Sequence, residues 1–174
     1  MNDLINHQSL SKICGKFIRH IGKKYNNKIT VSEYIIERFI NKKINIGFGY
    51  KSNKYTQFFN TTNKFNNFNV VFNHYDELTG LCAISYSKHT DNIGLILSTS
   101  TYGFTNICKP LKYAQHNKIP LLIMSFYDKE SELKVGKEFL YERKYLKTYY
   151  TANKSTDIPN ILEFVMMMSE LSKK

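Results

Sequence analysis

The stretch Ile93-Gly94-Leu95-Ile96-Leu97-Ser98 decides the fold class of this chain. It is a short and almost purely apolar run, which is typical of a strand buried on both faces, as in a parallel sheet. A helical pattern from about Phe104 to Asn117 follows it, and a second apolar run comes next at Ile119–Phe126. Pro110 falls inside this helix, so we expect a kink or a late start there. The stretch predicts a strand–helix–strand unit.

The same alternation extends outward in both directions. Further apolar runs predict the strands Asn45–Tyr50 and Asn69–His74, with a fifth strand around Thr148–Ala152. A capping box at Thr30–Glu33 opens a helix towards Lys42. The other expected helices follow Asn53 and cover about Asp76–Lys88 and Ile158–Leu171. Alternating strands and helices predict an α/β fold, a three-layer open parallel β-sheet with helices on both faces.

Residues 1–28 stand apart as a basic amphipathic extension of a domain formed by residues 29–174. One helical face is apolar, with Leu10, Ile13, Cys14, Phe17, Ile18 and Ile21. Another face carries the basic residues Lys12, Lys16, Arg19 and Lys23. Such a helix can bind nucleic acid, an acidic partner or a membrane surface. The alternative is a helix that packs its apolar stripe on the domain and leaves its lysines in solvent.

The amino-acid composition excludes several classes of protein. The 174 residues are 42% hydrophobic, which excludes a disordered chain and is enough for one domain with a real core. No apolar run is long enough to span a bilayer, and the N-terminus has no signal-peptide core. Cys14, Cys82 and Cys108 are an odd number with no close pair, which is typical of reduced cysteines. We therefore expect an intracellular, cytoplasmic protein in a reducing compartment.

The net charge and the spacing of the histidines indicate which ligands the chain could bind. The formal net charge of +11 attracts polyanions, so weak and non-specific nucleic-acid binding is expected. The excess comes from 22 Lys and only 3 Arg, beside 18 Asn and 18 Ile, which is the pattern of an AT-rich genome. The histidines are scattered and none has the spacing of a metal ligand, so no metal site is predicted.

A series of motifs then follows in a fixed order. They are Ile46–Tyr50 (Ile-Gly-Phe-Gly-Tyr), Val70–Asn73, Asp76–Gly80, Ala83 with Tyr86, Thr99–Asn106 (Thr-Ser-Thr-Tyr-Gly-Phe-Thr-Asn), Ala114–Leu122 and Asp157-Ile158-Pro159. Together they resemble the pyrimidine-binding (Pyr) N-terminal domain of thiamine-diphosphate-dependent enzymes, the acetolactate synthase and pyruvate decarboxylase group. The resemblance covers about Ile29–Leu162 and implies the thiamine-diphosphate-binding fold.

The resemblance implies a shared cofactor site. In that family a glutamate of the Pyr domain hydrogen-bonds the aminopyrimidine ring, and the cofactor carries the difficult chemistry. A second domain holds the diphosphate through a divalent metal with a Gly-Asp-Gly…Asn motif, which these residues lack. The isolated chain is therefore expected to hold no cofactor. Thiamine diphosphate with magnesium would bind only if a partner chain supplied the diphosphate domain.

Several positions of the implied site depart from the family pattern. Counting back from Tyr86 places Asp76 at the position of the catalytic glutamate, and a slip of one residue would place Glu77 there. An aspartate is one methylene shorter, and a misplacement of about 1 Å can cost about 100-fold in rate. The alternative role of both carboxylates is to stabilise a helix N-terminus.

The expected cofactor contacts are altered as well. They are Tyr50, Thr101, Tyr102, Gly103 and Asn106. The bulk of Thr101 and Tyr102 replaces glycine and proline of the family's turn, whereas Tyr50 is followed by residues that lack the family's two glycines.

These departures predict a degenerate, standalone Pyr domain that acts in association or scaffolding and does not catalyse on its own. A homodimer is the expected assembly. One alternative is the Pyr subunit of a split thiamine-diphosphate-dependent 2-oxoacid decarboxylase, completed by a separate cofactor-diphosphate subunit. The other is a basic nucleic-acid-associated protein, for which only the charge argues.

Overall fold

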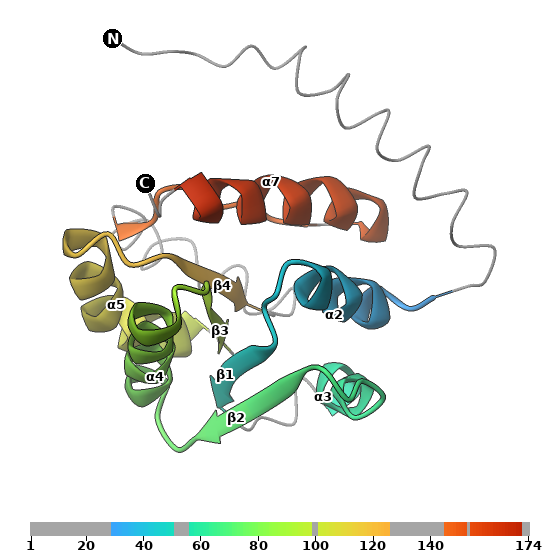
Figure 1. The fold of residues 1–174 in the computed structure, drawn as a ribbon, viewed down its shortest axis with the longest axis horizontal. Helices are drawn as coiled ribbons and strands as arrows, with labels where there is room; N and C mark the ends of the chain where they lie inside the picture. Colours follow the sequence, from blue (N-terminus) through green and yellow to red (C-terminus); the bar gives the residue numbers. More distant parts are fainter. Residues whose placement is uncertain (1–28, 51–55, 99–100, 126–144, 153, 172–174) are drawn as a thin grey trace, which may run out of the picture.

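The computed structural model describes residues 29–50, 56–98, 101–125, 145–152 and 154–171. Helices and strands alternate along the chain (Figure 1). The elements are α2 (Val31–Asn41), β1 (Ile46–Tyr50), α3 (Thr56–Thr62), β2 (Asn69–Asn73), α4 (Asp76–Thr90), β3 (Gly94–Ser98), α5 (Thr101–His116), β4 (Leu121–Ser125), the 3₁₀ helix η3 (Ser155–Asp157) and α7 (Ile158–Leu171).

The four described strands form one parallel sheet in the order β2-β1-β3-β4. β3 lies inside the sheet and every one of its residues is buried, as its apolar sequence predicts. β2 lies at an edge, and three of its five residues are exposed. The expectation that Asn69–His74 would be buried on both faces was therefore wrong, because an edge strand receives less cover from the helices.

Helices cover both faces of the sheet (Figure 1). On one face, α2, α3 and α7 pack against alternate strand residues around Leu95 and Leu97. On the other face, α4 and α5 pack against Phe48 and Ile96 through Ala83 and Ile107. The three-layer α/β architecture is therefore confirmed.

Two local expectations differ from the structure. Residues 148–152 form no strand, and the side chains of Tyr149 and Tyr150 are exposed. The α5 helix begins at Thr101 and contains Pro110 in its interior, so Pro110 does not mark a late start. The Pro110 ring is fully buried where α5 contacts Gly80 of α4.

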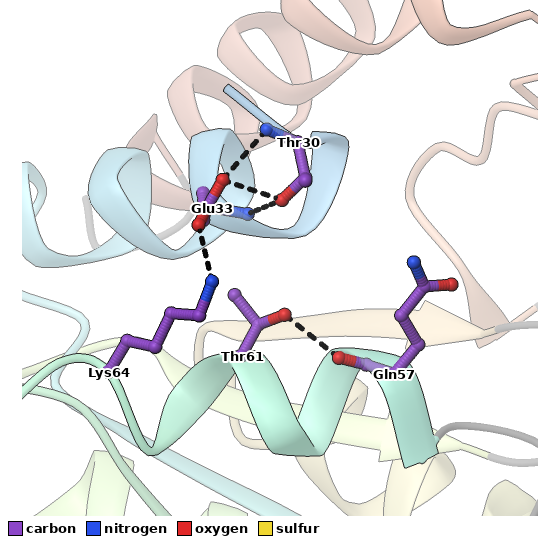
Figure 2. Close-up of polar contacts among 5 residues, drawn as sticks. All are labelled: Thr30, Glu33, Gln57, Thr61 and Lys64. Atoms are coloured by element: carbon purple, nitrogen blue, oxygen red, sulfur yellow. Dashed lines mark hydrogen bonds and ion pairs between the residues drawn. The ribbon is translucent and has the colours of Figure 1, made fainter. Parts of the chain in front are cut away.

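The predicted capping box starts α2 (Figure 2). The Glu33 amide donates to Thr30 Oγ1 over 3.2 Å, and the Thr30 amide donates to Glu33 Oε2 over 2.8 Å. Lys64, just after α3, donates to Glu33 Oε1 over 2.9 Å. These hydrogen bonds, first that of the Thr30 backbone and then that of Lys64, lower the pKa of Glu33 to about 2. One carboxylate thus joins the start of α2 to the end of α3.

Ion pairs join the first described helix to the last one. Arg38 of α2 pairs with Glu163 of α7, and both side chains are partly buried. At the C-terminal cap of α2, Lys42 Nζ lies 3.2 Å from Glu170 Oε1. Between these pairs and the sheet lies Met166, which is fully buried. α7 therefore closes one face of the domain over α2.

Candidate functional site

A row of polar residues ends the four apolar strands. Asn73 of β2 is paired with Tyr50 of β1, and Ser98 of β3 is paired with Ser125 of β4. Gly49 pairs with Leu97, so Tyr50 and Ser98 are the next residues of their two strands. Side chains of paired residues share a face of a sheet, and this row shares the face of Phe48 and Ile96, which α4 and α5 cover. The row lies at the carboxyl edge, where open α/β sheets bind ligands.

Three polar atoms at this edge are buried without a partner. They are Asn73 Nδ2, Ser98 Oγ and Asp76 Oδ1, none of which has a hydrogen-bond partner among the described residues. Ser98 is only 1% exposed. The other side-chain atom of Asn73, Oδ1, accepts a hydrogen bond from Cys82 Sγ over 3.8 Å, which orients the amide. A buried polar atom without a partner costs about 1–3 kcal/mol, so three of them at one edge mark this edge as the candidate ligand site.

Asp76 supplies the carboxyl group of the site. It is the first residue of α4 and lies three residues beyond Asn73, at the carboxyl edge of the sheet. Burial raises the pKa of the Asp76 carboxyl above its ordinary value, and a hydrogen bond from the Asn106 side chain partly offsets this rise. A carboxyl group of raised pKa can pair with an uncharged polar ligand as donor or acceptor.

Glu77, unlike Asp76, has a side chain at the surface. This side chain is 47% exposed, and its Oε1 lies 3.7 Å from Nζ of the exposed Lys109. The structure therefore places Asp76 among the buried polar residues at the carboxyl edge and pairs Glu77 with a lysine on the surface.

The structure brings some of the residues expected from the sequence together. Asn106 reaches Asp76, and Tyr50 lies in the polar row with its side chain 39% exposed. Thr101, Tyr102 and Gly103 form the first turn of α5, and only their backbone is described. The basic residues Lys12, Lys16, Arg19 and Lys23 lie outside the described residues.

Sequence reasoning missed Asn73 and Ser98 as site residues. Each is the polar residue that ends an apolar strand, Asn-Val-Val-Phe-Asn and Gly-Leu-Ile-Leu-Ser. This position was the available signal, because parallel strands bring their carboxyl ends to one edge.

The described residues offer no metal centre and no membrane-spanning helix. No group of three or more His, Cys, Asp and Glu side chains in the described ranges could hold a metal ion. His74 follows β2 as an exposed residue. None of the helices in the part of the chain that the structure describes has both the length and the apolar character needed to cross a membrane.

The chain resembles known proteins in sequence and in structure. Residues 29–150 match the family described as thiamine pyrophosphate enzyme, N-terminal TPP binding domain. No curated protein sequence matches the chain significantly.

Two solved structures share the fold. A 4-hydroxybenzoylformate decarboxylase of Rhodococcus jostii RHA1, which is thiamine diphosphate-dependent, superposes with a TM-score of 0.74 at 17% identity over 84% of this chain. A protein of Mycobacterium smegmatis, described as a thiamin diphosphate-dependent enzyme, gives a TM-score of 0.68 at 15% identity over 82% of this chain. The chain spans only 28% of the length of either protein.

Proposed function

Because the chain belongs to the family of thiamine pyrophosphate enzyme N-terminal domains, we propose that it is an association module that offers the pyrimidine side of a shared site. In this proposal the domain does not catalyse on its own. A second component, a further copy or another polypeptide, completes the site.

The carrying observation is the buried Asp76 Oδ1 that has no hydrogen-bond partner. A carboxyl group that served only to start α4 would find partners in the amides of the first turn or in water. Asp76 instead lies half-buried at the same carboxyl edge of the sheet as Ser98, whose Oγ also lacks a partner. This arrangement is costly for a domain that binds nothing and is expected of one that binds a polar ligand.

The donor set fits the aminopyrimidine ring of thiamine diphosphate. A carboxyl group pairs with a ring nitrogen, whereas the Ser98 hydroxyl and the Asn73 amide pair with the remaining polar edge. When bound in a complete enzyme, the cofactor supplies the carbanion that attacks the substrate. The residues of this chain would bind and orient the ring, with Asp76 holding a proton at its carboxyl group.

The proposal that the domain works only in association has two supports. The aspartate is one methylene shorter than the family's glutamate, which shortens its reach by about 1 Å. The 174 residues contain no Gly-Asp-Gly…Asn motif for the diphosphate, so that half of a site would come from outside them. A homodimeric scaffold and a split 2-oxoacid decarboxylase subunit both fit this description.

The test uses the full chain and two probes. We expect calorimetry to detect no binding of thiamine diphosphate with magnesium to this chain alone. The aminopyrimidine half of thiamine, at millimolar concentration, should shift the backbone amide resonances of Asn73, Asp76 and Ser98 in a saturable manner. Asp76→Asn should weaken that binding at least 10-fold, because the amide cannot supply the carboxyl proton. Asp157→Asn, which alters the last residue of η3 just before α7, is the matched control and should bind as the wild type does.

Two outcomes would contradict the proposal. Micromolar binding of the whole cofactor would show that the domain needs no second component. Equal pyrimidine shifts in Asp76→Asn and wild type would remove the carboxyl group from the site. Sedimentation equilibrium on the same samples distinguishes a dimer from a monomer that needs a different chain.

A further inference from the structure

Helices α4 and α5 run side by side in the same direction. Both follow a strand of the parallel sheet, so both begin at its carboxyl edge (Figure 1). They are in close contact at Gly80 and Pro110, where a Cβ atom on Gly80 would lie 2.7 Å from Pro110 Cβ and 2.8 Å from Pro110 Cγ. Real Cβ atoms do not come so close to other atoms, so only glycine allows this separation of the two helices.

One helical turn before this contact, the same two helices present the polar pair of the site. Asp76 lies four residues before Gly80 on α4, and Asn106 lies four residues before Pro110 on α5. Residues four apart share a helix face about one turn, 5.4 Å, from each other. The Gly80–Pro110 contact therefore places Asp76 and Asn106 at the same level of the two neighbouring helices. In agreement with this placement, a hydrogen bond from the Asn106 side chain lowers the pKa of the Asp76 carboxyl group.

We propose that Asn106 is a positioning residue for Asp76, and that the Gly80–Pro110 contact sets the distance between them. The Asn106 amide holds the carboxyl group while Oδ1 stays without a partner and available to a ligand. The role of this pair in ligand binding rests on the proposed function, but the contact between the two side chains does not. Asn106 thereby acts through Asp76, and this role differs from the direct cofactor contact that the family resemblance implies.

The charged and titratable groups around Asp76 and Asn106 do not hold the Asp76 carboxyl group as Asn106 does. On α4 the next residue is Glu77, which pairs with Lys109 of α5 on the surface. His74 of the preceding segment and Tyr50 of β1 are exposed. A hydrogen bond from the Asn106 side chain favours the ionised carboxylate of Asp76, whereas burial favours its neutral form.

The experiment follows the pH titration of the Asp76 carboxyl carbon by NMR, in the full chain and without any ligand. In Asn106→Ala the midpoint should move to higher pH, because the ionised form loses its hydrogen bond. In Asn106→Ser, which keeps a donor, the midpoint should lie between those of Asn106→Ala and the wild type. Asn117→Ala is the matched control, since the Asn117 side chain donates to the Tyr113 carbonyl at the other end of the same helix. It should titrate as the wild type does.

A second variant tests the spacing. Gly80→Ala touches neither polar side chain but forces the helices apart, so it should move the Asp76 midpoint in the same direction as Asn106→Ala. If the midpoint is the same in wild type and Asn106→Ala, the inference is overturned, whether or not Gly80→Ala folds. This result would leave the pyrimidine-binding test of the proposed function standing, because the titration involves no ligand.

Discussion

Gly94 lies directly against the backbone carbonyl of Ala83. A Cβ atom on Gly94 would come within 2.4 Å of the Ala83 oxygen and 2.7 Å of Leu121 Cδ2. This contact seats α4 on the first residue of β3, in the middle of the sheet. Backbone atoms cannot swing aside as the end of a side chain can, so the whole helix would have to move to admit a methyl group.

The first prediction is that Gly94→Ala destabilises the fold by about 1–3 kcal/mol, the usual cost of inserting a methyl group into a packed core. Thermal unfolding should show a drop of roughly 2–12 °C, at about 2–4 °C per kcal/mol for a chain of this size. Gly47→Ala is the control, because its nearest neighbour is the methyl end of Leu97 at 3.1 Å. If both variants lose the same stability, the carbonyl contact is not what excludes a side chain.

The second prediction concerns acid stability and Glu33. Its folded-state pKa, about 2, lies below its ordinary value of 4.5, so Glu33 stabilises the fold above pH 4.5 and loses this effect as the pH falls towards 2. Glu33→Gln should therefore be less stable than the wild type in urea at pH 7, and the difference should narrow below pH 4.5 and vanish near pH 2.

Glu77→Gln provides the comparison for Glu33. Its ion pair with the exposed Lys109 should contribute little, so its stability at pH 7 should match that of the wild type. A difference between Glu33→Gln and wild type that stays constant from pH 7 to pH 2 would argue against the capping box as its source.

The third prediction is that residues 1–28 are dispensable for folding of residues 29–174. The family match begins at residue 29. Deletion should lower the melting temperature by less than about 10 °C, since roughly 4 °C or less per kcal/mol is usual at this size. A larger drop would identify the apolar stripe of that segment as part of the core.

The fourth prediction separates specific nucleic-acid binding from simple charge attraction. With a net charge of +11, the chain should bind DNA or RNA weakly at low salt and release it by physiological salt. Changing Lys12, Lys16, Arg19 and Lys23 together to Ala should reduce the slope of log affinity against log salt by about 3–4, if these residues neutralise phosphates. Nanomolar binding at physiological salt, or preference for one sequence, would make nucleic acid the primary partner.

Apolar runs in the sequence predicted the inner strand of the sheet well, because a strand that is buried on both faces has an almost entirely apolar sequence. Gly94–Ser98 is predicted by composition alone. Residues 148–152 carry the Thr and Tyr residues that strands favour, yet they form no strand, because β propensity depends on neighbours for pairing and burial. Which strand lies at an edge also depends on topology, so the exposure of Val71 and Phe72 could not be predicted.

The residues of the candidate site follow from the sequence only in part, and their role stays a prediction. The spacing from Tyr86 pointed to Asp76, which lies at the polar carboxyl edge of the sheet, whereas Glu77 pairs with Lys109 on the surface. The unpaired state of Ser98 and Asn73 depends on strand register and on the helices that cover them, which single positions in a sequence do not reveal.

The pairing of α7 with α2 has a consequence for synthesis on the ribosome. Glu163 and Glu170 emerge 125 and 128 residues after their partners Arg38 and Lys42. Synthesis adds about 5–20 residues per second, so α7 is made on the order of 6–25 s after α2. During this interval the core cluster of Ile36 and Phe39 lacks Met166, so the nascent domain exposes apolar surface that can aggregate until α7 has been made.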